Sequence, residues 1–73
     1  MKPTVEIFSA TDPPHVHERR VRYWLEFEGR ASERLTEWAP VNKWALALMA
    51  EHGAYLLDRS DKGSGLLLAT LSG

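Results

Sequence analysis

The sequence lacks cysteine altogether, has no long hydrophobic run and carries almost no net charge. Without cysteine there is neither a disulfide nor a thiolate ligand for a structural zinc ion, so packing has to stabilise the fold. The longest uncharged apolar stretch, Trp44–Ala50, is far shorter than the roughly 20 residues that a membrane-spanning helix needs. No apolar run follows Lys2, which argues against a signal peptide. We therefore expect a soluble, cytoplasmic protein without membrane contact.

The charges nearly balance, with nine basic and ten acidic residues and a formal net charge of −1. A dedicated nucleic-acid-binding domain normally has a clear basic excess, which this chain does not have. The charges are clustered in a basic stripe and a following acidic group: Arg19, Arg20 and Arg22, then Glu26, Glu28, Glu33 and Glu37. Such a dipolar surface suits a protein partner with the complementary pattern.

The length of 73 residues fits one domain with one core, and we take 1–73 as that single domain. The hydrophobic content of 44%, with three Trp, two Tyr and two Phe, suffices for a packed core. A core of this size stabilises a fold by only about 3–5 kcal/mol, and we expect the free protein to be a monomer.

The stretch His17–Glu28 alternates apolar and polar residues, which is typical of a half-buried strand. One face would carry Val21, Tyr23, Leu25 and Phe27, and the other Arg20, Arg22, Trp24, Glu26 and Glu28. Thr4–Ala10 alternates in the same way, and after the break at two prolines we expect antiparallel pairing of the two stretches. Phe8 and Trp24 would then lie on one face.

Apolar residues at helical spacing predict one main helix that starts at Pro40 and ends at Gly53. Its apolar stripe comprises Val41, Trp44, Ala45, Leu48, Met49 and His52. Two neighbouring segments fit either a helix or a strand. Residues 31–38 suit a helical turn slightly better than a second strand of a hairpin turning at Gly29. Residues 54–58 either extend the helix or begin a strand.

The remaining segments are a polar loop at 59–65 and an apolar stretch at 66–71, which we expect to be a buried strand. We predict an α+β fold in which a small antiparallel sheet of two to three strands packs against one main helix. Trp38 and Trp44 should lie in the core, because so small a domain needs large side chains to fill it.

Two patterns resemble fragments of metal or catalytic sites. His15 and His17 would share one side of an extended segment, but two ligands do not make a metal site and we assign none. Glu26 and Glu28, roughly 6.5–7 Å apart by strand rise, are spaced like the carboxylates of inverting glycosidases. So short a chain rarely forms the cleft that such an enzyme needs. We expect no enzyme activity and no cofactor.

Trp24 lies out of phase with the apolar residues of its strand. It is therefore either exposed or covered by another segment, such as 66–71. An exposed tryptophan beside arginines has the composition of a binding hot spot. Our candidate partner-binding residues are Arg19, Arg20, Arg22 and Trp24.

In length and layout the chain resembles small phage-encoded transcription regulators that bind bacterial RNA polymerase. The resemblance rests on the short strand Thr4–Ser9, the Arg/Trp strand Arg19–Phe27 and the helix starting at Pro40. It implies binding near the RNA exit channel, with possible contact to the emerging RNA. It also implies inhibition of promoter-dependent initiation through the sigma factor, and antitermination at intrinsic terminators.

Two alternative functions fit the same residues. A small nucleic-acid-binding module would use Arg19, Arg20, Arg22 and Trp24 and would bind with a steep salt dependence. An inhibitor of another host enzyme would retain that enzyme, rather than polymerase, in affinity capture.

Overall fold

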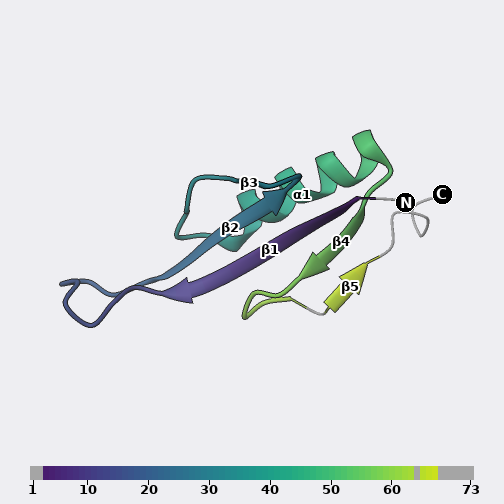
Figure 1. The fold of residues 1–73 in the computed structure, drawn as a ribbon. Coiled ribbons are helices and arrows are strands. Elements are labelled where there is room, and N and C mark those ends of the chain that lie inside the picture. Colours follow the sequence, from purple (N-terminus) through teal and green to yellow (C-terminus); the bar gives the residue numbers. More distant parts are fainter. Residues whose placement is uncertain (1–2, 64, 68–73) are drawn as a thin grey trace.

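One helix packs across one face of a five-stranded mixed sheet (Figure 1) in this computed structural model, which describes residues 3–63 and 65–67. The elements are β1 (Thr4–Thr11), β2 (Val21–Phe27), β3 (Arg30–Ala31), α1 (Trp38–His52), β4 (Tyr55–Asp58) and β5 (Gly65–Leu67). The strand order is β3-β2-β1-β4-β5. The α+β prediction is confirmed, but the sheet has more strands than the predicted two to three.

The sheet is mixed rather than antiparallel, because the chain crosses between its strands through α1. β2 runs antiparallel to β1, whereas β4 runs parallel to β1 on its other side. Segment 30–37 runs back along β2, and α1 then carries the chain to the end of the sheet where β1 begins (Figure 1). A strand that starts there has to run in the direction of β1.

The pairing of β1 with β2 is confirmed, and Phe8 lies opposite Trp24 as predicted. β2 is nonetheless shorter than the predicted strand His17–Glu28. Pairing begins only where Thr11 meets Val21, because two consecutive prolines in the connection remove backbone donors and prevent regular pairing. Residues 12–20 form a loop that extends beyond the rest of the molecule (Figure 1).

The helical turn expected at 31–38 is wrong, and the hairpin alternative is correct for the turn at Gly29 and for the start of the second strand, which ends at Ala31. Glu28 and Gly29 both have positive φ, 51° and 77°, as two-residue hairpin turns require. They connect β2 to β3, so Glu28 lies in a turn and does not share a strand face with Glu26. Beyond β3 the segment stays beside β2, where the backbone of Leu35 exchanges two hydrogen bonds, of 2.7 and 2.8 Å, with Tyr23.

The helix α1 begins at Trp38, two positions before the predicted start. Pro40 fits inside the first turn because the first four N–H groups of a helix have no intrahelical partner. Gly53 ends the helix as predicted, with a left-handed φ of 64°. The segment 54–58 begins a strand rather than extending the helix, since β4 runs from Tyr55 to Asp58.

The core lies between α1 and the sheet, and it contains the inward-facing residues of β1, β2, α1 and β4. These buried residues are Val5, Ile7, Tyr23, Leu25, Val41, Ala45, Met49, Ala54 and Leu56. The prediction that Trp44 is core is wrong, because its side chain is 42% exposed while its neighbour Ala45 is fully buried. The small residue Ala45 faces the sheet. Consecutive residues of an α-helix lie about 100° apart around its axis, so Trp44 points away from the sheet.

Asp58 joins the start of α1 to the turn after β4. Its carboxylate accepts a hydrogen bond of 2.8 Å from the Trp38 indole and bonds of 2.9 and 2.6 Å from the amide and hydroxyl of Ser60. Gly63 passes so close to Asp58 that a Cβ there would collide with it. Trp38 is therefore half-buried against the core, with its one polar group satisfied.

In the polar loop that we predicted at 59–65, Ser60 is buried, and the last residue already belongs to β5. The strand expected at 66–71 is confirmed for residues 66 and 67, which pair with β4. Residues 68–71 lie outside the described part of the chain.

Candidate contact surface

The sheet has two chemically different sides, and α1 covers only one of them. Val5 and Ile7 of β1 point toward the helix, so the alternate residues of β1 point to the uncovered side. The same alternation in β2 buries Tyr23 and Leu25 on the helix side and places Arg22, Trp24 and Glu26 on the opposite side. We call this side the open face and define it by Glu6, Phe8, Arg22, Trp24 and Glu26.

An aromatic pair forms the centre of the open face. The rings of Phe8 and Trp24 are stacked, with centroids 5.8 Å apart and planes inclined by 20°. The guanidinium carbon of Arg34 lies 4.1 Å from the centroid of the Trp24 ring, a cation–π contact. Both aromatic side chains are half-buried by these contacts. Trp24 is therefore not fully exposed. Residues 66 and 67 of the segment that we considered as its cover belong to β5, which β1 and β4 separate from β2, and residues 68–71 lie outside the described part of the chain.

Carboxylates stand beside the aromatic pair. Glu6 and Glu26 are directly opposite each other on β1 and β2, an arrangement of like charges that costs stability unless it is offset. Arg59 offsets it, because its Nε lies 2.8 Å from the Glu6 carboxylate. Glu26 is exposed and accepts a hydrogen bond of 3.2 Å from the Trp24 indole.

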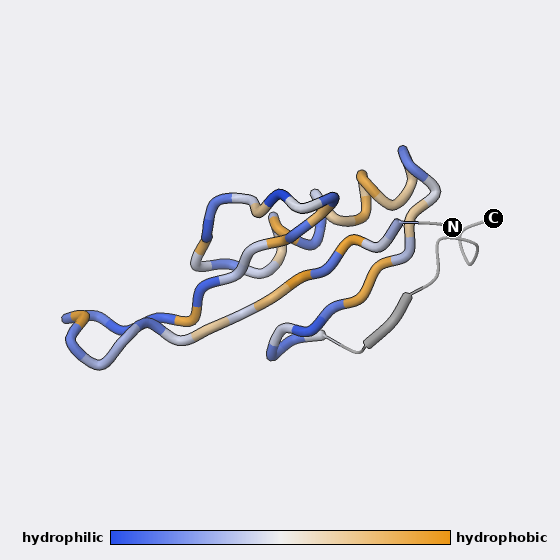
Figure 2. Tube along the Cα trace, viewed as in Figure 1, coloured by the Kyte–Doolittle hydropathy of each residue, from blue (hydrophilic) through white to orange (hydrophobic). Residues whose placement is uncertain are grey.

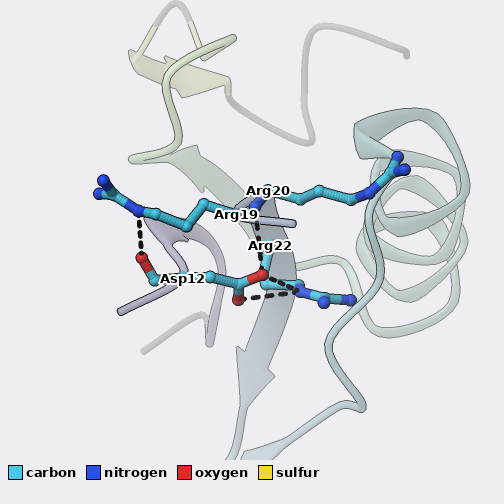
Figure 3. Close-up of polar contacts among 4 residues, drawn as sticks. All are labelled: Asp12, Arg19, Arg20 and Arg22. Carbon is cyan, nitrogen blue, oxygen red and sulfur yellow. Dashed lines mark hydrogen bonds and ion pairs between the residues drawn. The ribbon is translucent and has the colours of Figure 1, made fainter. Parts of the chain in front are cut away.

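Asp12 connects the three predicted arginines at the base of the loop 12–20 (Figure 3). Its carboxylate accepts hydrogen bonds from Nε of Arg22 at 3.0 and 3.2 Å and from the backbone amide of Arg20 at 3.2 Å. Its backbone carbonyl accepts a bond of 3.2 Å from Nε of Arg19. We call these four residues the loop cluster. It fixes the start of a loop composed mainly of hydrophilic residues (Figure 2).

The loop cluster changes the electrostatics of the basic stripe. The hydrogen bond from Arg22 holds the pKa of the Asp12 carboxyl below its ordinary value of 3.8. The same bond raises the pKa of Arg22, so both groups stay charged and neutralise each other. Arg20 lies 3.7 Å from the exposed carboxylate of Glu18. The stripe therefore presents less unmatched positive charge than its sequence indicates.

The four predicted contact residues occupy two regions. Arg22 and Trp24 lie on the open face, as their alternation in β2 indicates. Arg19 and Arg20 precede β2 and lie in the exposed loop, where their side chains extend to opposite sides (Figure 3). Arg34 did not appear among the sequence candidates. Only the hairpin alternative for 31–38 brings it beside β2.

The remaining polar patterns do not converge. His15 and His17 are exposed in the loop 12–20. Across residues 3–63 and 65–67, no group of three or more His, Cys, Asp or Glu side chains is placed to hold a metal ion. Within the same residues, no helix combines the length and the apolar composition needed to cross a membrane.

Comparison of the chain with protein-family models, with curated proteins and with solved structures gives no match. The function has to be argued from the open face and the loop cluster themselves.

Proposed function

We propose that this protein binds bacterial RNA polymerase in the host cytoplasm without catalysing a reaction, as a phage-type inhibitor of transcription initiation that also promotes antitermination. The observation that carries a contact function is the aromatic pair on the side of the sheet that α1 leaves uncovered. Aromatic residues and arginine are the types most enriched at interface hot spots. The choice of polymerase rests on the resemblance in length and layout.

Three carboxylates support contact rather than catalysis, because the structure already uses them internally. Asp12 is bound to arginines, Glu6 to Arg59, and Asp58 to Trp38 and Ser60. Their hydrogen bonds fix the loop, the sheet and the first turn of the helix. Side chains with these hydrogen bonds keep the surface in a defined shape. Less conformational entropy is then lost when a partner binds.

Replacing Trp24 by alanine tests this proposal. We expect Trp24→Ala to weaken binding to purified RNA polymerase by about 1–2 kcal/mol, which is roughly 5- to 30-fold in Kd. Inhibition of promoter-dependent transcription and readthrough of an intrinsic terminator should decrease in parallel. Biolayer interferometry and single-round transcription measure these effects.

The chain provides a control in an exposed tryptophan outside the open face, Trp44 of α1. Trp44→Ala removes a side chain of the same kind from the helix layer and should leave polymerase binding unchanged. A wild-type protein that does not bind polymerase would contradict the proposed partner. Loss of binding in Trp44→Ala but not in Trp24→Ala would place the contact on the helix instead.

The nucleic-acid alternative predicts that the isolated protein binds RNA tightly, whereas our proposal predicts that it does not. With a net charge of −1 and Arg22 neutralised by Asp12, we expect no tight binding to RNA. Submicromolar, sequence-independent RNA binding in a gel shift at about 150 mM salt would favour that alternative. A protein that makes only a few phosphate contacts binds RNA weakly at this salt concentration, so tight binding would require more contacts than we expect.

A further inference from the structure

Arg34 differs from the other arginines near the open face in its charge balance. Arg22 and Arg59 each form a close ion pair, with Asp12 and Glu6. No carboxylate of the described residues lies within ion-pair distance of Arg34. Its guanidinium is nevertheless oriented, because it lies over the Trp24 ring. Arg34 is thus an oriented cation that has no ion-pair partner among the described residues.

The segment that carries Arg34 is fixed before any partner arrives. Both backbone hydrogen bonds between Leu35 and Tyr23 are short, and the amide of Ser32 donates to the carbonyl of Leu25 at 2.8 Å. The hydroxyl of Ser32 in turn accepts from the amide of Leu25 at 2.9 Å. An arginine that is already positioned loses less conformational entropy when it binds a carboxylate.

Glu26 provides the opposite charge at the same tryptophan. It accepts the indole hydrogen bond of Trp24, it is exposed, and no cation of the described residues lies within ion-pair distance of it. Its cross-strand neighbour Glu6 is neutralised by Arg59. Trp24 is therefore in contact with one unmatched cation and one unmatched carboxylate.

We propose that Arg34 and Glu26 form a two-charge recognition site around Trp24, which binds a carboxylate and a cation on the folded surface of a protein partner. This inference rests on the proposed function, since it assigns the partner chemistry of the same open face. The fixed charges favour a protein over a nucleic acid. The phosphate backbone of a nucleic acid would be attracted by Arg34 but repelled by Glu26. The backbone also carries no cation that could pair with the Glu26 carboxylate.

The first experiment measures binding of purified RNA polymerase to three variants of the proposed site and to one control variant. We expect Arg34→Ala to weaken binding about tenfold and to reduce its salt dependence. Arg34→Lys should recover only part of the loss, because lysine keeps the charge but not the planar stack on Trp24. Glu26→Gln keeps an acceptor for the indole, removes the charge and should also weaken binding. Lys43→Ala, an exposed cation on α1, is the matched control and should bind like wild type.

The second experiment does not need polymerase. Capped peptides containing glutamate and lysine together, glutamate alone or lysine alone are titrated into ¹⁵N-labelled protein, and single-stranded RNA is added as a fourth probe. The Nε–H signals of Trp24 and Arg34 should shift most with the mixed peptide, and the Trp24 shift should be lost in Arg34→Ala.

Each outcome decides between the proposals. Polymerase binding that Arg34→Ala and Glu26→Gln leave unchanged would overturn the two-charge site while the proposed function stands. Polymerase that does not bind wild type, together with a shift by the mixed peptide, would overturn only the choice of polymerase. No preference for the mixed peptide, or a larger shift of the wild-type Trp24 signal with RNA than with the mixed peptide, would overturn the protein-recognition site.

Discussion

Asp12 decides how the arginines of the loop and of β2 act together. Its side chain neutralises Arg22 and binds the backbone of Arg20, while its own amide donates to the carbonyl of Arg20 at 2.9 Å. Without this carboxylate, the basic stripe would gain one unmatched cation. The loop would also lose the hydrogen bond to the Arg20 amide, while the two bonds through the Asp12 backbone do not depend on the carboxylate. A single acidic residue therefore contributes both to the shape of the loop and to the charge balance of the basic stripe.

Acid should weaken the fold through Asp12. Its pKa in the folded state lies below its ordinary value of 3.8, so its contribution to stability is complete above that value. The contribution is lost as the pH falls through the lower, folded-state pKa. NMR titration of the Asp12 carboxyl should give a midpoint below 3.8.

Asp12→Asn provides the control for this pH dependence. Urea unfolding should find wild type more stable than the variant near neutral pH, and the difference should disappear below both pKa values. A difference that persists undiminished well below the Asp12 midpoint found by NMR would contradict the role of the charged Asp12, because both side chains are then neutral.

At the scale of elements, α1 determines the core through one narrow line of contact. Val41, Ala45 and Met49 are buried at intervals of four residues, and Leu48 is only partly buried beside them. The predicted stripe was wider because it counted every apolar residue on that half of the helix. Ala45 contributes by being small, which lets the helix backbone approach the sheet.

Truncating Met49 should therefore cost more than truncating Leu48. We expect Met49→Ala to lower the free energy of unfolding by about 2–4 kcal/mol, and Leu48→Ala by roughly half as much, because only Met49 leaves a closed cavity. Urea unfolding monitored by circular dichroism measures both. If Met49→Ala does not fold, Met49→Leu, which keeps the volume, should fold at close to wild-type stability. A larger loss for Leu48→Ala would show that the helix is rotated from the position described.

For the whole molecule, the two sides of β2 separate stability from recognition. Tyr23 and Leu25 lie under the helix, whereas Trp24 and Glu26 lie on the open face. The hydroxyl of Tyr23 is also engaged, since its hydrogen bond to Asp61 raises the pKa of the phenol. A change of sequence in β2 should thus affect folding or binding according to its position in the alternation.

Neighbouring substitutions in β2 should have opposite consequences. Tyr23→Ala removes a buried ring, a loss of about 3–5 kcal/mol, which equals the expected stability of so small a domain and should unfold it. Trp24→Ala should keep a dispersed ¹H–¹⁵N spectrum. If Trp24→Ala unfolds the protein and Tyr23→Ala does not, the assignment of the two faces is reversed.

The sequence by itself determined the elements that depend on local periodicity. The alternation in β2 placed Tyr23 and Leu25 inside and Trp24 outside, and it predicted the shared face of Phe8 and Trp24. Gly53 marked the end of the helix because it readily adopts the left-handed conformation. These signals suffice because each arises from the geometry of a few consecutive residues.

Only the tertiary structure decided which neighbours these elements have. The sequence did not distinguish a helical turn from a hairpin at 31–38, so it gave no reason to place Arg34 over Trp24. The sequence indicated a basic stripe of three arginines. It did not indicate that the Asp12 carboxylate, at the other end of the loop between β1 and β2, neutralises one of them. It placed Trp44 in the core, although the sheet contacts only the narrow line through Ala45. The physical reason is the same in each case. Packing and charge balance depend on contacts between residues that are distant in sequence, and local periodicity does not predict such contacts.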